Sequence, residues 1–469
     1  MVFSSMVFLW IFLPVVFVLS LVIRKPQYQN ILLLAASLLF YAWGEPRNIL
    51  LLLVSIVMNW IFGLLIDRCK AKAKGFLILD IIANLALLGY FKYTDFFINT
   101  INHIVPGASI PLANIALPIG ISFFTFQAMS YVIDLYRGQI KVQKNVLYLA
   151  LYVSFFPQLI AGPIVKYRDI ELQIENRTVN MARISSGFRR FVYGLGKKVL
   201  ISNLVGQAVD NLYGLDTASL TGGMAWLCAL TYTLQIYYDF SGYSDMAIGL
   251  GRMFGFDFLE NFNYPYLSSS IREFWRRWHI SLSTWFQEYL YIPLGGNRKG
   301  NAATYRNLLI VFLATGMWHG ASWTFIAWGL YHGFFSIIER LGLGKLLSKV
   351  KPLAHIYTMV VVMIGWVFFR VDTFRQGFDI VKRMLLPWMY TQTSVILGTQ
   401  VGMEAVIAII CGVIGCGVLQ AVFSGQRTAV IVQKWKGSFP EFLWCALVLF
   451  ACILKLAGNT YNPFIYFRF

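Results

Sequence analysis

Two neighbouring segments of the chain contain three of its five histidines. The first is SSSIREFWRRWHISLSTWFQEYLYIPLGGNRKG (residues 268–300), and the second is ATGMWHGASWTFIAWGLYHG (residues 314–333). His279 and His319 each follow a tryptophan within a strongly apolar chain. An ionisable group at membrane depth is costly and is therefore a functional candidate. We take His279 and His319 as the first candidate site residues and interpret His332 as structural.

The composition is that of a polytopic membrane protein. Of the 469 residues, 58% are hydrophobic, 17% are aromatic and only 13% are charged, which excludes an ordinary soluble domain. The net charge of +18 comes from short Lys and Arg clusters between apolar runs, as in cytosolic loops, so we exclude nucleic acid as a partner. The six cysteines show no spacing typical of metal ligands or disulfides, and we expect no metal site.

Apolar runs of about 20 residues predict membrane-spanning helices along the whole chain. The first run, residues 1–23, is followed rather than preceded by basic residues, so it should stay attached with its N-terminus outside. Further runs cover residues 29–43, 49–66, 76–98, 112–135, 199–208, 224–250, 356–369, 404–423 and 442–456. We expect ten or eleven spans plus one or two re-entrant elements, in an all-α fold with a single domain over residues 1–469.

Two apolar segments have basic loops at both ends and are expected to turn back within the membrane. Residues 145–165 contain Pro157, Gly162 and Pro163, which favour a re-entrant loop, although an ordinary kinked span is the alternative. Residues 307–338 are too long for one simple span, and we expect a pair of helices bent around GMWHGAS. His319 would then lie near the turn, where burial favours the uncharged imidazole that general-base chemistry needs. The alternative is a histidine that hydrogen-bonds to neighbouring helices.

The sequence IREFWRRWHISL predicts an interfacial helix. Its aromatic residues share one helical face with His279, and Glu273 can pair with Arg277 one turn later. Arg276 should point to the cytosol. In the following PLGGNRKG turn, backbone N–H groups with Arg298 and Lys299 could hold phosphate, but a plain loop near anionic lipid fits equally well.

Two carboxylates lie in the long apolar run of residues 224–250. Asp239 and Asp245 are six residues apart, so they point to different faces of a helix, which argues against a shared proton. Each either bonds to a neighbouring helix or lines a substrate path.

Six motifs follow one another along the chain: FFTFQAMSYVIDLYRG (residues 123–138), FFPQLIAGPI (155–164), YYDFSGYSDMAIG (237–249), FWRRWHISLSTWF (274–286), YLYIPLGGNR (289–298) and GMWHGASWTF (316–325). In this combination they resemble the membrane-bound O-acyltransferase family, in the bacterial branch that acetylates alginate, peptidoglycan and other exopolysaccharides. The resemblance covers nearly the whole chain. Gln287 and Glu288 depart from the Arg-Asp pair usual in this branch, which puts in doubt the ion pair that this dipeptide makes.

This resemblance implies a ring of helices around a central funnel, in which an acyl group passes from a cytosolic donor to an acceptor outside. It identifies His319 with the invariant histidine of the family and His279 with the second motif histidine. The donor would be acetyl-CoA, with no permanently bound cofactor. The acceptor would be an extracytoplasmic polysaccharide of the cell envelope or a secreted or anchored acetyltransferase. D-alanyl transfer toward teichoic acid from a carrier-protein thioester is the alternative within the family.

We therefore expect an O-acetyltransferase of the bacterial cell membrane, in contact with membrane lipid. His319 would act as general base and His279 would steady the oxyanion. Candidate donor-binding residues are Arg276, Arg277, Arg298 and Lys299, and candidate residues of the substrate path are Asp239, Asp245, Gln127 and Gln158. Rival functions are a proton or solute transporter that uses the same intramembrane groups, and a scaffold for polymer export.

Overall fold

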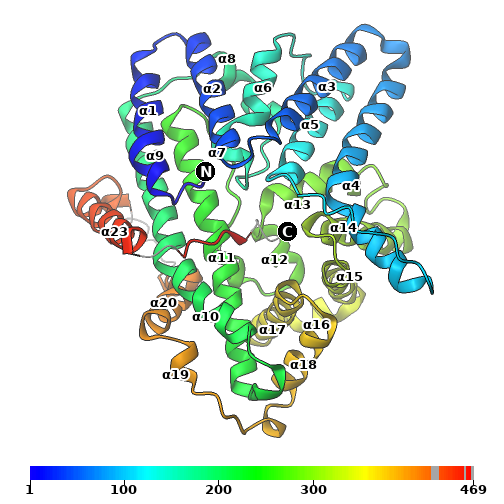
Figure 1. The fold of residues 1–469 in the computed structure, drawn as a ribbon, viewed down its shortest axis with the longest axis vertical. Helices are drawn as coiled ribbons and strands as arrows, with labels where there is room; N and C mark the ends of the chain where they lie inside the picture. The colour runs from blue at the N-terminus through cyan, green and yellow to red at the C-terminus, as the bar shows by residue number, and fades with distance from the viewer. Residues whose placement is uncertain (424–432, 459–460, 466–469) are drawn as a thin grey trace. The chain divides into compact units, whose positions relative to one another are not determined.

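The computed structural model describes residues 1–423, 433–458 and 461–465, and within these ranges the only regular elements are helices (Figure 1). This confirms the all-α expectation. The chain forms two compact units, which are described one at a time. The first unit comprises Met1–Phe191 and Met246–Leu259, and the second comprises Val192–Asp245 and Glu260–Phe469. The helices α9 and α11 contribute residues to both units.

The first unit contains the N-terminal helices of the chain. Helix α3 packs against α4 and α5, and α2 packs against α6 and α7. The helices are a π-helical turn at Phe8–Phe12, α1 (Leu13–Val22), α2 (Pro26–Gly44), α3 (Ile49–Arg68), a 3-10 turn at Lys70–Lys72, α4 (Ala73–Ile104), α5 (Ile121–Tyr136), α6 (Val146–Ser154), α7 (Phe156–Leu159), α8 (Tyr167–Glu175) and α9 (Met181–Gly196).

The second unit contains most of α11 and all later helices. Its elements up to residue 338 are a π-helical segment at Lys197–Ser202, α10 (Asn203–Tyr213), α11 (Gly222–Met253), α12 (Ile271–Arg277), α13 (Ile280–Phe286), a π-helical turn at Gln287–Tyr291, α14 (Gly300–His319) and α15 (Trp323–Ile338). They are followed by a π-helical turn at Glu339–Leu343, α16 (Gly344–Leu347), α17 (Lys351–Arg370), α18 (Phe374–Leu385), α19 (Leu397–Gln400), α20 (Met403–Val413), a π-helical turn at Ile414–Val418, α21 (Leu419–Val422) and α23 (Phe439–Gly458). Short 3-10 turns occupy Thr217–Ser219, Pro265–Leu267 and Pro387–Met389.

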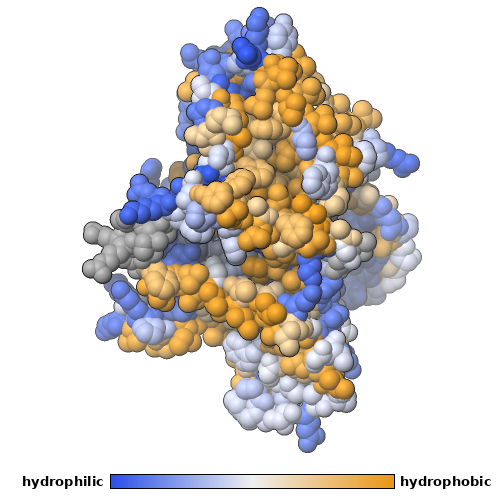
Figure 2. Space-filling model, turned by 90° about the vertical axis from the view of Figure 1, so that its left-hand side faces the viewer, coloured by the Kyte–Doolittle hydropathy of each residue, from blue (hydrophilic) through white to orange (hydrophobic). Residues whose placement is uncertain are grey.

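Five helical segments in the described part of the chain are long and apolar enough to cross a membrane: Ile49–Arg68, Lys70–Ile104, Lys351–Arg370, Met403–Val422 and Phe439–Gly458. Their outward side chains include many exposed large hydrophobics, such as Leu50 at 67% and Leu447 at 61% exposure. Figure 2 shows large areas of apolar residues on one face of the molecule, as lipid contact requires. The expected total of ten or eleven spans stays a prediction.

The segment expected to be re-entrant is broken in the structure, as its proline and glycine residues predicted. Asn145 accepts a hydrogen bond from the N–H of Leu147 and so caps α6, which ends after nine residues at Ser154. The four-residue α7 follows, and residues 160–166 are irregular. Because every residue from 149 to 167 is buried, the irregular backbone is enclosed by protein.

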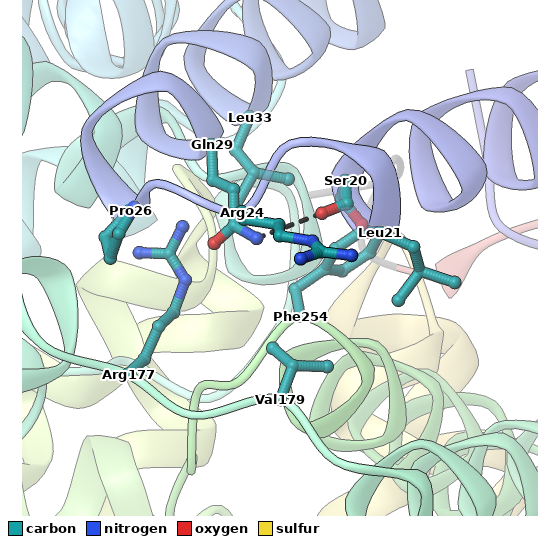
Figure 3. A pocket seen from close by; sticks show the side chains of 9 residues that line it. All are labelled: Ser20, Leu21, Arg24, Pro26, Gln29, Leu33, Arg177, Val179 and Phe254. Atoms are coloured by element: carbon teal, nitrogen blue, oxygen red, sulfur yellow. Dashed lines mark hydrogen bonds between the residues drawn. The ribbon is translucent and has the colours of Figure 1, made fainter.

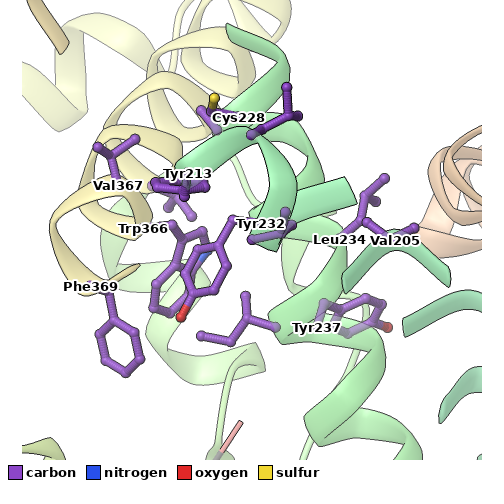
Figure 4. Close-up of a cluster of buried hydrophobic side chains, with 14 of the residues drawn as sticks. Val205, Tyr213, Cys228, Tyr232, Leu234, Tyr237, Trp366, Val367 and Phe369 are labelled. Carbon is purple, nitrogen blue, oxygen red and sulfur yellow. The ribbon is translucent and has the colours of Figure 1, made fainter. Parts of the chain in front are cut away.

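The core of the second unit is rich in aromatic side chains. Tyr232 and Tyr237 of α11 and Trp366 and Phe369 of α17 belong to this buried cluster (Figure 4). The cluster also contains Trp278, which directly precedes His279. The histidines of the candidate site are thus set in a rigid aromatic environment rather than in a flexible loop.

Candidate functional site

Helix α12 has a well-defined start at the edge of the candidate site. The Ser270 hydroxyl accepts a hydrogen bond from the N–H of Glu273, and the Glu273 carboxylate accepts one from the N–H of Ser269. Burial would raise the pKa of Glu273, but the bonds from Ser269 and Arg277 outweigh it and hold this pKa below its usual range. Glu273 also forms the predicted ion pair with Arg277, at 2.9 Å. This pair is confirmed, so Arg277 has a carboxylate partner on its own helix.

A second carboxylate binds the same helix start from a distant part of the sequence. Glu339, which follows α15, accepts hydrogen bonds from the N–H groups of Ile271 and Arg272 at 2.6 and 3.2 Å. Burial raises the pKa of Glu339, while these two bonds act in the opposite direction. No pattern in the sequence indicates this contact, which connects α12 to the end of α15.

The expected continuous interfacial helix is wrong, because the chain breaks at Trp278 and His279. Helix α12 ends at Arg277, α13 begins at Ile280, and His279 adopts the left-handed conformation with φ 43° and ψ 56°. That conformation costs about 1–3 kcal/mol for a residue other than glycine, so the surroundings must enforce it. The loop before α12 holds this backbone in place, because the backbone carbonyl of Asn261 accepts a 2.9 Å hydrogen bond from the N–H of Ile280.

His279 is oriented by Asn261. The imidazole is 1% exposed, and its Nδ1 lies 3.1 Å from Oδ1 of Asn261. The same Oδ1 accepts hydrogen bonds from the N–H and the hydroxyl of Ser281, while Nδ2 of Asn261 donates to Ser244. Because Oδ1 acts only as an acceptor, Nδ1 of His279 must carry the proton. The opposite nitrogen, Nε2, is buried and has no hydrogen-bond partner among the described residues.

His319 lies at the helix break that the sequence predicted around GMWHGAS. Helix α14 ends at His319, residues 320–322 are non-helical, and α15 begins at Trp323 after the Ser322 cap. The two helices pack closely because Gly316 faces α15: a Cβ atom there would lie 2.4 Å from the carbonyl oxygen of Phe325. Such close packing fixes the end of α14 and therefore the position of His319.

One indole ring contacts both candidate histidines. The ring of Trp318 lies 5.9 Å from that of His279 and 5.0 Å from that of His319, centroid to centroid. Trp328 and Phe369 also contact His319, each at 5.1 Å with a steep interplanar angle. The structure therefore gathers His279 and His319, 40 positions apart in sequence, into one aromatic cluster of the second unit.

His332 belongs to the same aromatic surroundings but has a different setting. It is fully buried, and its ring packs edge-to-face on Trp275 and Trp328. The ring also lies close to the backbone of α17: a Cβ atom added at Gly365 would be only 2.7 Å from Nε2 of His332. Neither ring nitrogen of His332 has a hydrogen-bond partner among the described residues, and its structural interpretation stays a prediction. Among the described residues, no group of three or more His, Cys, Asp or Glu side chains could hold a metal ion.

Three arginines place positive charge along and beside α12. Arg272, Arg276 and Arg340 are exposed, and none of them has an ion-pair partner among the described residues. Burial, then the charges of Arg276 and Arg340, lower the pKa of Arg272, so the three guanidinium groups influence one another. Of these three arginines, only Arg276 was predicted from the sequence to bind the donor. Arg340 lies 64 positions beyond Arg276.

The glycine turn with Arg298 and Lys299 is a structured loop. The N–H groups of Gly295, Gly296 and Arg298 donate to the backbone carbonyls of Ile292, Tyr291 and Gly295, and Asn307 donates to the Gly296 carbonyl. These N–H groups are thus occupied and do not point at an anion, which favours the plain-loop interpretation of the backbone. The side chains of Arg298 and Lys299 are exposed.

Each carboxylate of α11 has its own lysine. Asp239 forms an ion pair with Lys198 at 2.5 Å, and both side chains are at most 3% exposed. Asp245 forms one with Lys197 at 2.6 Å. Adjacent lysines on the π-helical segment Lys197–Ser202 thus meet carboxylates on different faces of α11, as the six-residue spacing predicted. These pairs supply a structural role for both aspartates, and their place in a substrate path stays a prediction.

Gln127 and Gln158 lie in the first unit, on α5 and α7. Both are fully buried. Gln158 donates to the backbone carbonyl of Tyr152, whereas neither polar atom of the Gln127 amide has a hydrogen-bond partner among the described residues. A buried amide without a partner is costly, and the place of both glutamines in a substrate path stays a prediction.

The chain is similar to known proteins over its full length. Residues 140–370 match the model of the membrane-bound O-acyltransferase family. The chain is 39% identical to the probable alginate O-acetylase AlgI of Pseudomonas aeruginosa, with 100% of both chains covered. It is 40% identical to the peptidoglycan O-acetyltransferase of Helicobacter pylori over 82% of this chain and 80% of that protein. The teichoic acid D-alanyltransferase of Bacillus subtilis is 27% identical over 47% of this chain and 58% of its own.

Proposed function

Because the chain belongs to the membrane-bound O-acyltransferase family, we propose that it moves an acetyl group from cytosolic acetyl-CoA across the membrane to a hydroxyl group outside. The protein is a multi-pass O-acetyltransferase of the cell membrane. The proposed acceptor is an extracytoplasmic polysaccharide such as alginate or peptidoglycan, or a secreted or anchored acetyltransferase that passes the group on. Identity of 39% and 40% to acetyltransferases over 100% and 82% of the chain, against 27% over 47% of the chain to a D-alanyltransferase, supports acetyl as the group.

The observation that carries this proposal is the pair of buried imidazoles in contact with Trp318. We assign His319 as general base. It takes the proton of the acceptor hydroxyl as that oxygen attacks the carbonyl carbon of the thioester. The C–S bond then breaks, and the proton passes to the leaving thiolate. The products are the acetyl ester and free CoA thiol, so atoms and charge balance without a further reactant.

His279 is the second proton-exchanging group in this proposal. With Nδ1–H bonded to Asn261, the uncharged ring offers Nε2 as an acceptor, so it can donate to an oxyanion only after Nε2 gains a proton. The bond to Asn261 is made by the charged and uncharged ring alike. His279 can therefore change its protonation state without losing its orientation, and this refines the simple oxyanion role expected from the sequence.

The donor would be attracted by the exposed arginines at α12. Acetyl-CoA carries several phosphate charges, and guanidinium groups bind phosphate with paired hydrogen bonds. Arg272, Arg276 and Arg340 form no ion pair in the described part of the chain, so their charge is available to a ligand, although the charge of Glu339 partly offsets that of Arg272. Arg298 and Lys299 would add to this positive field, whereas Arg277 is engaged by Glu273.

The remaining elements of the proposal concern the path through the membrane. We propose ten or eleven spans plus re-entrant elements in a single domain, arranged as a ring around a central funnel. The broken segments α6–α7 and α14–α15 support this arrangement, because irregular backbone at membrane depth needs a protein-lined environment. Gln127, Gln158, Asp239 and Asp245 remain our candidates for lining the path.

The donor can be tested with purified protein in liposomes, using acetyl-CoA with a labelled acetyl group. We expect label to appear in an added polysaccharide acceptor, or as free acetate when water replaces the acceptor. A D-alanyltransferase would leave this label untouched and use only a carrier-protein thioester. A transporter would move solute without cleaving the thioester, and a scaffold would do neither, so either result would refute the proposal.

A further inference from the structure

The first unit contains a pocket with a volume of about 220 Å³ whose charged residues are both arginines. Arg24 and Arg177 line it together with the polar side chains of Ser20 and Gln29 and with apolar residues. Figure 3 shows the two guanidinium groups around one space, with Phe254 and Val179 below them in this view. The remaining lining residues are Leu21, Pro26 and Leu33. The pocket thus combines two positive charges with an apolar wall, and no acidic residue lines it.

Arg177 is held firmly in place although no carboxylate neutralises it. Its Nη1 donates to Oδ1 of Asn30 at 2.6 Å, and its guanidinium lies 4.8 Å from the ring centroid of Phe256. It has no ion-pair partner among the described residues. Burial lowers the pKa of Arg177 to about 10, so it keeps its charge at neutral pH. A partly buried cation of this kind needs an anion to offset its charge.

The helix ends at the pocket strengthen its preference for an anion. Helix α2 begins at Pro26, which lines the pocket, and no side chain caps this start. A helix N-terminus carries partial positive charge. The C-terminal carbonyls of α1, whose partial charge is negative, are already occupied: Gln29 donates to the carbonyls of Ser20 and Ile23 at 3.0 and 2.6 Å.

The apolar side of the pocket continues into a lipid-facing surface. Leu21 and Val22, at the end of α1, are 47% and 72% exposed, and the outward residues of the preceding turns, such as Val18, are also exposed and apolar. Arg24 and Lys25 follow directly, as basic residues do at the cytosolic end of a membrane helix. An acyl chain can therefore run along α1 while a polar head group enters the pocket.

We propose that this pocket binds the phosphate group of an anionic phospholipid. Two arginines match the charge and hydrogen-bonding geometry of phosphate. The volume lies below the roughly 300–1,000 Å³ of pockets that enclose drug-sized ligands, so the head group enters while the chains stay in the membrane. The lipid ties α1, α2 and the loop before α9 together. This inference does not depend on the proposed transfer reaction.

The test compares lipids and phosphate as ligands of the purified full-length protein. Thermal unfolding is followed in mixed micelles that contain phosphatidylglycerol, in micelles with the same fraction of phosphatidylcholine, and with inorganic phosphate alone. We expect phosphatidylglycerol to raise the Tm, phosphatidylcholine to raise it less, and inorganic phosphate to leave it unchanged. An equal rise with inorganic phosphate would show a site for a free anion and would overturn the lipid assignment.

Variants locate the effect. Arg24→Gln removes an exposed pocket arginine without breaking any hydrogen bond of the described structure, and we expect it to weaken phosphatidylglycerol binding about 10-fold. Lys25→Gln removes the same charge one position away, outside the pocket lining, and should bind like the unsubstituted protein. Arg177→Gln should abolish binding if it folds. Equal effects of Arg24→Gln and Lys25→Gln would mean non-specific attraction to the membrane and would overturn the proposal.

Discussion

Nδ1 of His279 lies 3.1 Å from Oδ1 of Asn261, and the backbone carbonyl of the same asparagine accepts a hydrogen bond from Ile280. Asn261 therefore sets both the ring orientation of His279 and the left-handed backbone that carries it. No periodic pattern in the sequence singles out this asparagine. It becomes visible only when the loop before α12 is folded against the break between α12 and α13.

The first prediction concerns Asn261 as a positioning residue. Asn261→Ala should lower kcat about 100-fold with little change in KM for acetyl-CoA, because a misplaced catalytic group costs rate rather than donor binding. Asn261→Asp should keep the ring in place but raise the pKa of His279 through its negative charge. Protonated His279, the form that can donate to an oxyanion, would then persist to higher pH, so the alkaline limb of the pH–rate profile should move to higher pH. Identical pH profiles for the Asp variant and the unsubstituted enzyme would contradict this role.

A second prediction separates the arginines of α12. Arg276→Gln and Arg272→Gln should each raise KM for acetyl-CoA about 5-fold at low salt, since each removes a charge that forms no ion pair in the described part of the chain. The rise in KM relative to the unsubstituted enzyme should shrink as salt is added, because salt screens the charges. Arg277→Gln is the matched control on the same helix. Because Arg277 pairs with Glu273, its loss should lower the Tm slightly and leave KM nearly unchanged.

Donor titrations at two salt concentrations check these values. A larger effect of Arg277→Gln on KM than of Arg276→Gln would contradict the assignment of the donor surface.

A third prediction distinguishes the structural from the functional role of Asp239. Asp239→Asn leaves Lys198 charged and buried, which should cost about 3–5 kcal/mol of stability. Asp245→Asn should cost less, because its partner Lys197 is 31% exposed. Thermal unfolding of the purified variants shows which of the two substitutions costs more stability.

The double variant Asp239→Leu with Lys198→Met then tests function. It removes both charges and should restore most of the stability. If Asp239 lines the substrate path, this folded variant should still lack activity. Full activity in the double variant would show that the ion pair is structural only.

Much of the site could be predicted from local patterns in the sequence. The spacing of Glu273 and Arg277 predicted their ion pair. The length of the apolar run of residues 307–338, with basic loops at both ends, predicted the helix break at His319. The six-residue spacing of Asp239 and Asp245 predicted that they would face different partners. In each case the information lies within one continuous stretch of sequence.

The features that were missed depend on contacts between distant segments. Trp275, Trp278 and His279 have the spacing of a continuous helix, so nothing local predicts the break, which requires the Asn261 loop. Likewise, Glu339 and Arg340 reach α12 only because α12 packs on α15. Such contacts depend on how helices pack, and a single sequence does not encode them as a local pattern.

The central claim is that His319 is the base of acetyl transfer, and its most direct test is the rate of a folded variant. In liposomes, the His319→Ala variant should transfer acetyl from labelled acetyl-CoA about 10²- to 10⁴-fold more slowly than the unsubstituted enzyme. His103→Ala, which alters an exposed histidine far from this cluster in sequence, should retain the full rate. Size-exclusion chromatography confirms that both variants are folded. A His319→Ala protein that is folded and transfers acetyl at the rate of the unsubstituted enzyme would contradict the account.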